Sequence, residues 1–214
     1  MMRTRYAGEL DAVRQNLIAM GETTMALLAE GLRAVVDPSP DGAAWASELE
    51  ARTDHQHRLI HDQCLNLITL QSPVARDARL ITGALDAIVD LELIGDYAYE
   101  MVGLGSAKQG RLPSQILSQI SDIGAKIREI LAAAIESWRN QDKGLALSAR
   151  PREAAIRAEC HALAEKVALL TSAPGDVTAY VNLLLICRHL ERIMRHAVCV
   201  AEQAAEAAPA SPAG

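Results

Sequence analysis

The sequence predicts an all-α protein made of two three-helix bundles related by an internal pseudo-twofold repeat. Half of its 214 residues are hydrophobic, yet it has no Phe, only two Trp and only four Tyr. A core of Leu, Ala, Ile, Val and Met favours helices over strands. Apolar residues recur at steps of three and four, and segments containing Pro or Gly divide the chain into six stretches of helical length.

Three helices are predicted in the first half. The first ends at DPSPDG, residues 37–42, which contains two Pro and one Gly. The second spans residues 43–70, and the third runs from the break at Pro73 to residue 104. The stripe that predicts the first helix consists of Leu10, Val13, Leu17, Met20, Thr24, Leu27, Leu28, Leu32 and Val35.

The second half repeats this rhythm after GSAKQGRLPS, residues 105–114. Helices are predicted over residues 115–140, 142–171 and 177–206, and Pro151 should kink the middle one or begin it afresh. Long helices joined by short loops pack as antiparallel bundles. The expected division is residues 1–107 for the first bundle, 108–206 for the second and 207–214 for a disordered tail.

Composition disfavours several classes of protein. The chain has 21 basic and 27 acidic residues and no Lys/Arg-rich run, which disfavours direct nucleic-acid binding. There is no apolar run of membrane-spanning length and no signal-peptide pattern, so a cytoplasmic protein is expected. No nucleophile with its base is recognisable, and an enzyme is not expected. The four cysteines form no C-x-x-C motif and are expected to be free thiols: Cys64, Cys160, Cys187 and Cys199.

One short pattern occurs twice with a changed charge. DLELIGDYAYE, residues 90–100, and HLERIMRHAVC, residues 189–199, share a Leu-Glu-x-Ile core. The first copy has Glu92 and Asp96, and 99 residues later the second has Glu191 and Arg195. The same change occurs on the preceding helices, which carry two further pairs, Glu50 with Asp54 and Glu153 with Arg157.

Residues four apart lie on one face of a helix. If the two acidic pairs of the first half face each other, the four carboxylates must bind a cation or take up protons, and oxygen ligands suit Mg, Ca, Mn or Fe. A solvated acidic face is the alternative. In the second half, Arg157 and Arg195 would form salt bridges with Glu153 and Glu191, so that guanidinium groups neutralise the carboxylates instead of a metal.

These segments resemble the PhoU family, regulators of bacterial phosphate uptake. LELIGDYAYE and LERIMRHA resemble the two copies of its L-E-R-I-G-D-x-A signature, and residues 64–81 and 20–32 resemble its Q-x-P-x-A-x-D-L-R-L-I stretch and its first helix. The resemblance implies a negative regulator of phosphate uptake and phosphate-starvation signalling. Such a regulator is an adaptor between the ATPase subunit of the phosphate ABC transporter and a sensor histidine kinase, reaches the membrane only through these partners, and is expected to be a homodimer.

The family also carries repeated acidic motifs that hold metal clusters, with Mg, Mn, Fe or Zn as candidate ions here. Met194 and Arg195 replace the Gly-Asp of the second signature, and Arg157 replaces another Asp. The metal-ligand positions that remain are Glu50, Asp54, Glu92 and Asp96, with Asp90 and Glu100 as flanking candidates. A metal-dependent or metal-storing helical bundle is the alternative function.

Two further features of the helices leave alternatives open. His57 and His61 are four residues apart, which is compatible with a transition-metal site or with a stripe that faces solvent or a partner. Gly83, Gly95 and Gly103 lie in the third predicted helix, where each costs about 1 kcal/mol relative to Ala and is a candidate for close helix contact.

Overall fold

The computed structural model describes residues 2–71, 73–107, 113–170 and 177–209. These residues form six long helices and one short helix, and they include no strand. The helices are α1 (Met2–Val36), α2 (Pro40–Gln71), α3 (Ala75–Ser106), α4 (Ser114–Asn140), α5 (Lys143–Leu147), α6 (Arg150–Leu170) and α7 (Val177–Ala207). The predicted all-α fold class is confirmed.

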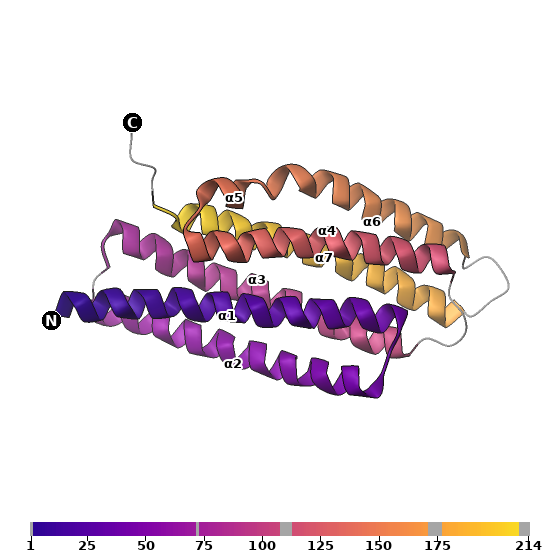
Figure 1. The fold of residues 1–214 in the computed structure, drawn as a ribbon, viewed down its shortest axis with the longest axis horizontal. Coiled ribbons are helices and arrows are strands. Elements are labelled where there is room, and N and C mark those ends of the chain that lie inside the picture. The colour runs from indigo at the N-terminus through magenta and orange to yellow at the C-terminus, as the bar shows by residue number, and fades with distance from the viewer. Residues whose placement is uncertain (1, 72, 108–112, 171–176, 210–214) are drawn as a thin grey trace.

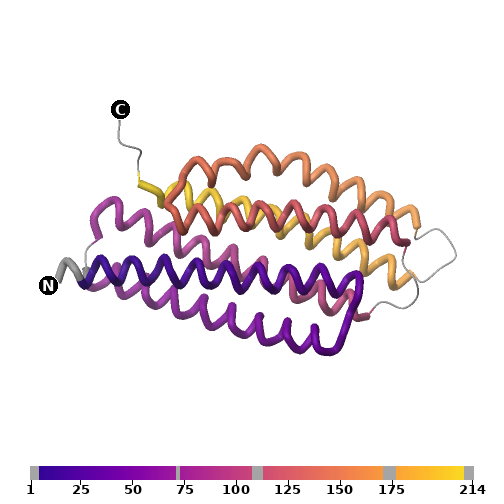
Figure 2. Tube along the Cα trace, viewed as in Figure 1, coloured from indigo at the N-terminus to yellow at the C-terminus, as the bar shows by residue number. Residues whose placement is uncertain are grey.

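The long helices form two antiparallel three-helix bundles that lie side by side (Figure 1). The first bundle consists of α1, α2 and α3, and the second of α4, α6 and α7, with α5 packed on α4 and α7. The bundles meet where α3 packs on α7 and α1 packs on α4. Figure 2 shows that successive long helices run in opposite directions, so that α1 begins and α7 ends at the same end of the molecule.

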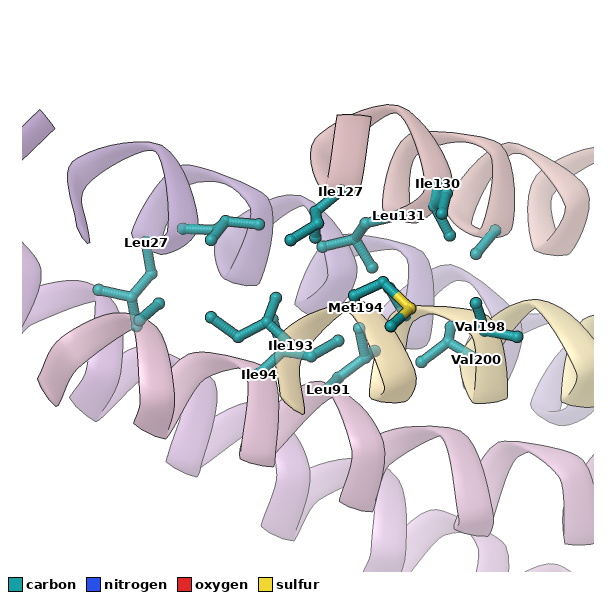
Figure 3. Packing of buried hydrophobic residues seen from close by; sticks show 14 of the residues in the cluster. Leu27, Leu91, Ile94, Ile127, Ile130, Leu131, Ile193, Met194, Val198 and Val200 are labelled. Carbon is teal, nitrogen blue, oxygen red and sulfur yellow. The ribbon is translucent and has the colours of Figure 1, made fainter. Parts of the chain in front are cut away.

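One hydrophobic core runs through both bundles where they meet. Figure 3 shows aliphatic side chains of this core from four helices, among them Leu27 of α1, Leu91 of α3, Leu131 of α4 and Met194 of α7. Burying one such side chain contributes about 1.5–3 kcal/mol. The stripe predicted on the first helix faces this core: Val13, Leu17, Met20, Thr24, Leu27, Leu28 and Val35 are buried, and Leu10 and Leu32 pack at its edge.

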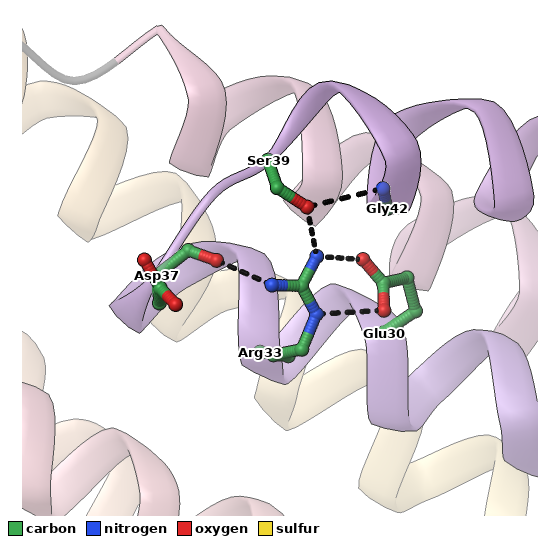
Figure 4. A network of polar contacts seen from close by, with 5 residues as sticks. All are labelled: Glu30, Arg33, Asp37, Ser39 and Gly42. Carbon is green, nitrogen blue, oxygen red and sulfur yellow. Dashed lines mark hydrogen bonds and ion pairs between the residues drawn. The ribbon is translucent and has the colours of Figure 1, made fainter.

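Arg33 organises the turn between α1 and α2 (Figure 4). Its guanidinium donates to both carboxylate oxygens of Glu30, at 2.9 and 2.5 Å, to a backbone carbonyl oxygen of the turn at 2.6 Å, and to Ser39 Oγ at 2.9 Å. Ser39 Oγ also accepts a hydrogen bond from the Gly42 N–H at 3.1 Å, as a helix N-cap does. Pro40 takes the first helical position, where its missing N–H is not needed. For these reasons α2 begins before the predicted residue 43.

The predicted helix over residues 142–171 is divided in the structure. The short α5 is capped by Asp142, whose side chain accepts a hydrogen bond from the Leu145 N–H at 3.0 Å. The second part, α6, begins at Arg150 and has Pro151 in its first turn, a position at which Pro is tolerated. Of the two outcomes expected at Pro151, the structure therefore shows a fresh start.

The predicted boundary between the bundles and the predicted start of the tail both lie close to residues that the structure does not describe. Residues 108–112, next to the boundary expected between the bundles, lie outside the described residues. The expected tail begins at Ala207, the last residue of α7, and Ala208 is still buried, whereas residues 210–214 lie outside the described residues.

None of the helices in the described ranges combines the length and the apolar composition needed to cross a membrane. All four cysteines are free thiols, as predicted. Burial raises the pKa of Cys64 and of Cys187 to about 11, and that of Cys160 to about 12. These three thiols are therefore protonated at neutral pH and pack as small apolar groups.

Candidate functional site

Four carboxylates of the first bundle form what we call the acidic face: Glu50 and Asp54 on α2, and Glu92 and Asp96 on α3. Asp96 is exposed at the surface, but partial loss of hydration against the neighbouring helices raises its pKa, and the negative charges of the other three carboxylates and of Glu100 raise it further. The two predicted pairs therefore lie near enough to repel one another across the contact between α2 and α3.

A buried contact between Thr53 and Gly95 holds α2 against α3 beside the acidic face. Thr53 is 2% exposed, and its hydroxyl donates to the carbonyl oxygen of Leu49 at 3.0 Å. A Cβ on Gly95 would lie 3.5 Å from Thr53 Cγ2, which is ordinary van der Waals contact. Because Asp54 and Asp96 directly follow these two residues, the contact places both carboxylates at the rim of the helix interface.

The acidic face has two basic neighbours on α2. Glu92 Oε2 lies 3.1 Å from His57 Nδ1, and Asp54 Oδ2 lies 3.6 Å from Arg58 Nη1. In the described part of the chain, no three His, Cys, Asp or Glu side chains are gathered closely enough to hold one metal ion. Carboxylate oxygens and excess negative charge still suit a hard divalent cation in chemical terms. Metal ligation by these four carboxylates stays a prediction.

The two histidines singled out on α2 differ in their surroundings. Their rings lie edge to face with centroids 6.5 Å apart, but only His57 has a carboxylate of α3 beside it. His61 Nδ1 lies 3.5 Å from Asp62 on its own helix, and both side chains are exposed to solvent. His61 therefore faces solvent, whereas His57 is partly buried at the edge of the acidic face.

The equivalent positions of the second bundle carry Glu153 and Arg157 on α6, with Arg157 Nη1 3.9 Å from Glu153 Oε1. On α7, the position that corresponds to Gly95 is occupied by Met194, whose side chain is 1% exposed. The residue that departs from the family signature thus fills the core between the bundles (Figure 3).

Glu191 does not pair with Arg195, the partner that the four-residue spacing predicted. Glu191 binds Arg188 Nη1 at 2.6 Å and lies 3.5 Å from His161 Nε2 of α6, and no ion pair with Arg195 is present within the described residues. Residues three and four away lie on the same helix face, so Arg188 competes with Arg195 for this carboxylate. Burial would raise the pKa of Glu191, but the hydrogen bonds from Arg188 and His161 outweigh it, and the pKa is lowered.

Tyr97 of α3 lies between two histidines of α7 where the bundles meet. Its ring is stacked against those of His189 and His196, with centroids 5.5 and 6.0 Å away. Arg192 donates from Nη1 to the Tyr97 hydroxyl at 2.7 Å, and its guanidinium carbon lies 5.2 Å from the ring centroid, as in a cation–π contact. The sequence held one signal for this cluster, the two histidines seven residues apart on one helix face.

Asp90 and Glu100, the acids of α3 that flank the predicted metal ligands, both bind residues of α7 in the other bundle. Asp90 lies 2.7 Å from His196 Nδ1 and accepts a hydrogen bond from Gln203 Nε2 at 2.7 Å. Glu100 Oε2 lies 3.1 Å from His189 Nε2. Both acids are therefore engaged by α7 and are less available to a cation on the acidic face.

A groove of about 770 Å³ opens between α3, α6 and α7 beside Tyr97. We call it the arginine groove, because Arg157, Arg188, Arg192 and Arg195 line it. The second bundle thus presents a cationic groove at the positions where the first bundle presents its acidic face.

Comparison with known proteins shows which family has this architecture. A model of the PhoU domain matches residues 17–104 and 120–204. A "phosphate-specific transport system accessory protein PhoU homolog" of Pseudomonas aeruginosa is 27% identical over 92% of this chain and 83% of its own length. One of Synechocystis sp. is 25% identical over 94% of this chain and 90% of its own length.

Solved structures give the same fold. The crystal structure of PhoU from Pseudomonas aeruginosa superposes with a TM-score of 0.86, at 24% identity over 93% of this chain and 96% of its own. That of the phosphate transport system regulatory protein PhoU from Streptococcus pneumoniae superposes with a TM-score of 0.84, at 19% identity over 93% and 94% of the two chains. With the family model matched once in each bundle, the chain belongs to the PhoU family.

Proposed function

We propose that this protein is an accessory protein of a phosphate transport system that represses phosphate uptake and phosphate-starvation signalling when phosphate is plentiful. The match to the PhoU domain in both bundles carries the proposal. It is supported by relatives that align over most of their length and are named phosphate-specific transport system accessory proteins.

In this proposal the protein acts as a cytoplasmic, homodimeric adaptor and not as an enzyme. Its partners are the ATPase subunit of the phosphate ABC transporter and a sensor histidine kinase, bound by helix-on-helix contact. The outer helix α2 suits such contact, since Trp45 is 48% exposed and Leu59 is 41% exposed. These residues are 14 positions apart, or nearly four helical turns, and therefore lie close to one face.

Deletion of the gene tests the regulatory role. The deletion strain should show raised alkaline phosphatase and phosphate uptake in high-phosphate medium, and the wild-type gene should restore repression. If contact through α2 is needed, Trp45→Ala should fail to restore it. Leu169→Ala on α6, where the side chain is 77% exposed, is the matched control and should restore it. A deletion strain whose activities stay as low as those of its parent would show that the chain is not a negative regulator.

A metal-dependent or metal-storing bundle is the second candidate function. It is favoured by the four carboxylates that α2 and α3 bring together on the acidic face, because a cation would relieve their mutual repulsion. Metal analysis of the purified protein is the test. Asp96→Ala should lose bound metal, whereas Arg195→Ala in the second bundle should retain it. Equal metal content in the two variants would exclude the acidic face as the metal site.

A further inference from the structure

The arginine groove concentrates positive charge on an acidic protein. Four arginines line it against three carboxylates, Asp90, Glu153 and Glu191, although the whole chain carries a formal net charge of −6. Arginine side chains from α6 and α7 therefore converge on this groove of about 770 Å³. This volume lies within the range of roughly 300–1,000 Å³ that is typical of small-molecule sites.

The carboxylates of the groove already have partners. Asp90 is bound by His196 and Gln203, at 2.7 Å each. Glu191 is bound by Arg188 at 2.6 Å, with His161 at 3.5 Å. Both carboxylates are therefore already held by groups other than Arg192 and Arg195 before any ligand enters.

Two of the arginines are not compensated in this way. Arg192 donates from Nη1 to the hydroxyl of Tyr97 and lies over its ring, contacts that orient the guanidinium without neutralising it. Arg195 is exposed and makes no ion pair among the residues that the structure describes. The two are three residues apart on α7 and share a face, to which Arg157 of α6 adds a guanidinium whose carboxylate partner is 3.9 Å away.

We infer that the arginine groove binds a soluble small molecule that carries at least two phosphate groups. The planar guanidinium fork matches phosphate oxygens in a bidentate manner and keeps its charge at every physiological pH. Guanidiniums one turn apart on α7, with a third from α6, can hold more than one phosphate group. The groove is also larger than a single orthophosphate requires, which favours a diphosphate.

This inference is carried by the groove and does not rest on the proposed regulatory role. Calorimetric titration of the full chain with inorganic pyrophosphate, in metal-free buffer at moderate salt, tests it. Saturable binding is expected, tighter than with orthophosphate. Arg195→Gln should weaken it about tenfold or more, the loss expected when a hydrogen bond between charged groups is removed. Arg192→Gln should weaken it similarly.

Arg128→Gln is the matched control, because Arg128 is exposed on α4, does not line the groove, and gives the same change in net charge. It should bind pyrophosphate like the wild type, and thermal unfolding should show that all three variants are folded. Arg195 is exposed, so its substitution leaves the core intact.

Three results would overturn the inference. The first is no saturable binding of pyrophosphate by the wild-type protein. The second is equal weakening by Arg128→Gln and Arg195→Gln, which would mean that overall charge and not the groove attracts the anion. The third is binding confined to vesicles that contain phosphatidylglycerol, which would make the ligand a lipid headgroup. The deletion test of phosphate regulation is independent of all three.

Discussion

Replacing Gly105 by Ala should destabilise the protein, because α1 and α3 touch backbone to backbone at this residue. A Cβ on Gly105 would clash with the carbonyl oxygen of Ala34 and would lie 2.6 Å from the carbonyl carbon of Ala34 and 2.9 Å from the backbone nitrogen of Val35. Side-chain carbons do not approach backbone atoms so closely, so one of the two helices has to move.

The size of the effect follows from two opposing terms. Overpacking by one methyl group costs about 1–3 kcal/mol, whereas Ala is better than Gly inside a helix by roughly 0.5–1 kcal/mol. Gly103 isolates the second term, because it lies in the same last turn of α3 and a Cβ there would meet no atom within 4 Å. The two variants should therefore differ by about 1–3 kcal/mol, or on the order of 2–12 °C in Tm for a chain of this size.

Urea unfolding followed by circular dichroism gives the comparison directly. Gly103→Ala should raise the urea midpoint relative to wild type. Gly105→Ala should have a lower midpoint than Gly103→Ala. Gly31→Ala is a second case, since its Cβ would lie 2.6 Å from the carbonyl oxygen of Ala98. Equal midpoints for Gly103→Ala and Gly105→Ala would refute the close approach of α1 and α3.

Three further predictions concern charge. The raised pKa of Asp96 means that the folded state releases this proton less readily than the unfolded chain does, so the stability of the protein falls as pH rises above 3.8, the ordinary pKa of an Asp side chain. The variant Asp96→Asn should therefore be more stable than wild type at pH 7, and this difference should disappear in acid. Urea midpoints across pH check this, and a variant less stable at pH 7 would contradict it. Burial lowers the pKa of His189 and outweighs the opposing charge of Glu100, with the smallest contribution, also lowering, from Arg192. The unfolded chain therefore binds more protons than the folded one below the ordinary value of 6.5, and stability should fall as pH drops through that range. His189→Asn should make the decline shallower, and parallel declines in variant and wild type would exclude this role. The double variant Arg157→Asp, Arg195→Asp places four carboxylates in the second bundle and should be less stable without metal; added Mn²⁺ should raise its Tm more than that of wild type, and an equal rise would argue against a metal site there.

Much of the fold follows from the sequence alone. Segments containing Pro and Gly marked the ends of the helices, and the spacing of apolar residues showed which face of the first helix is buried. The acidic pairs were also predictable, because a separation of four residues fixes a common helix face whatever the tertiary structure. Local propensity and helical period are properties of the chain itself, which is why they can be read without coordinates.

The tertiary structure decided which residues meet across helices. Their place inside the third predicted helix singled out Gly83, Gly95 and Gly103, yet among the glycines that the structure describes the tightest approaches to another helix's backbone are at Gly31 and Gly105. The partner of Glu191 and the groove around Tyr97 also emerged only from the packing of α3, α6 and α7. Helical period determines the face on which a side chain lies, but it does not determine which helix lies opposite or which of two equally spaced arginines reaches a carboxylate. Those choices depend on how the helices pack, both within each bundle and between the two bundles.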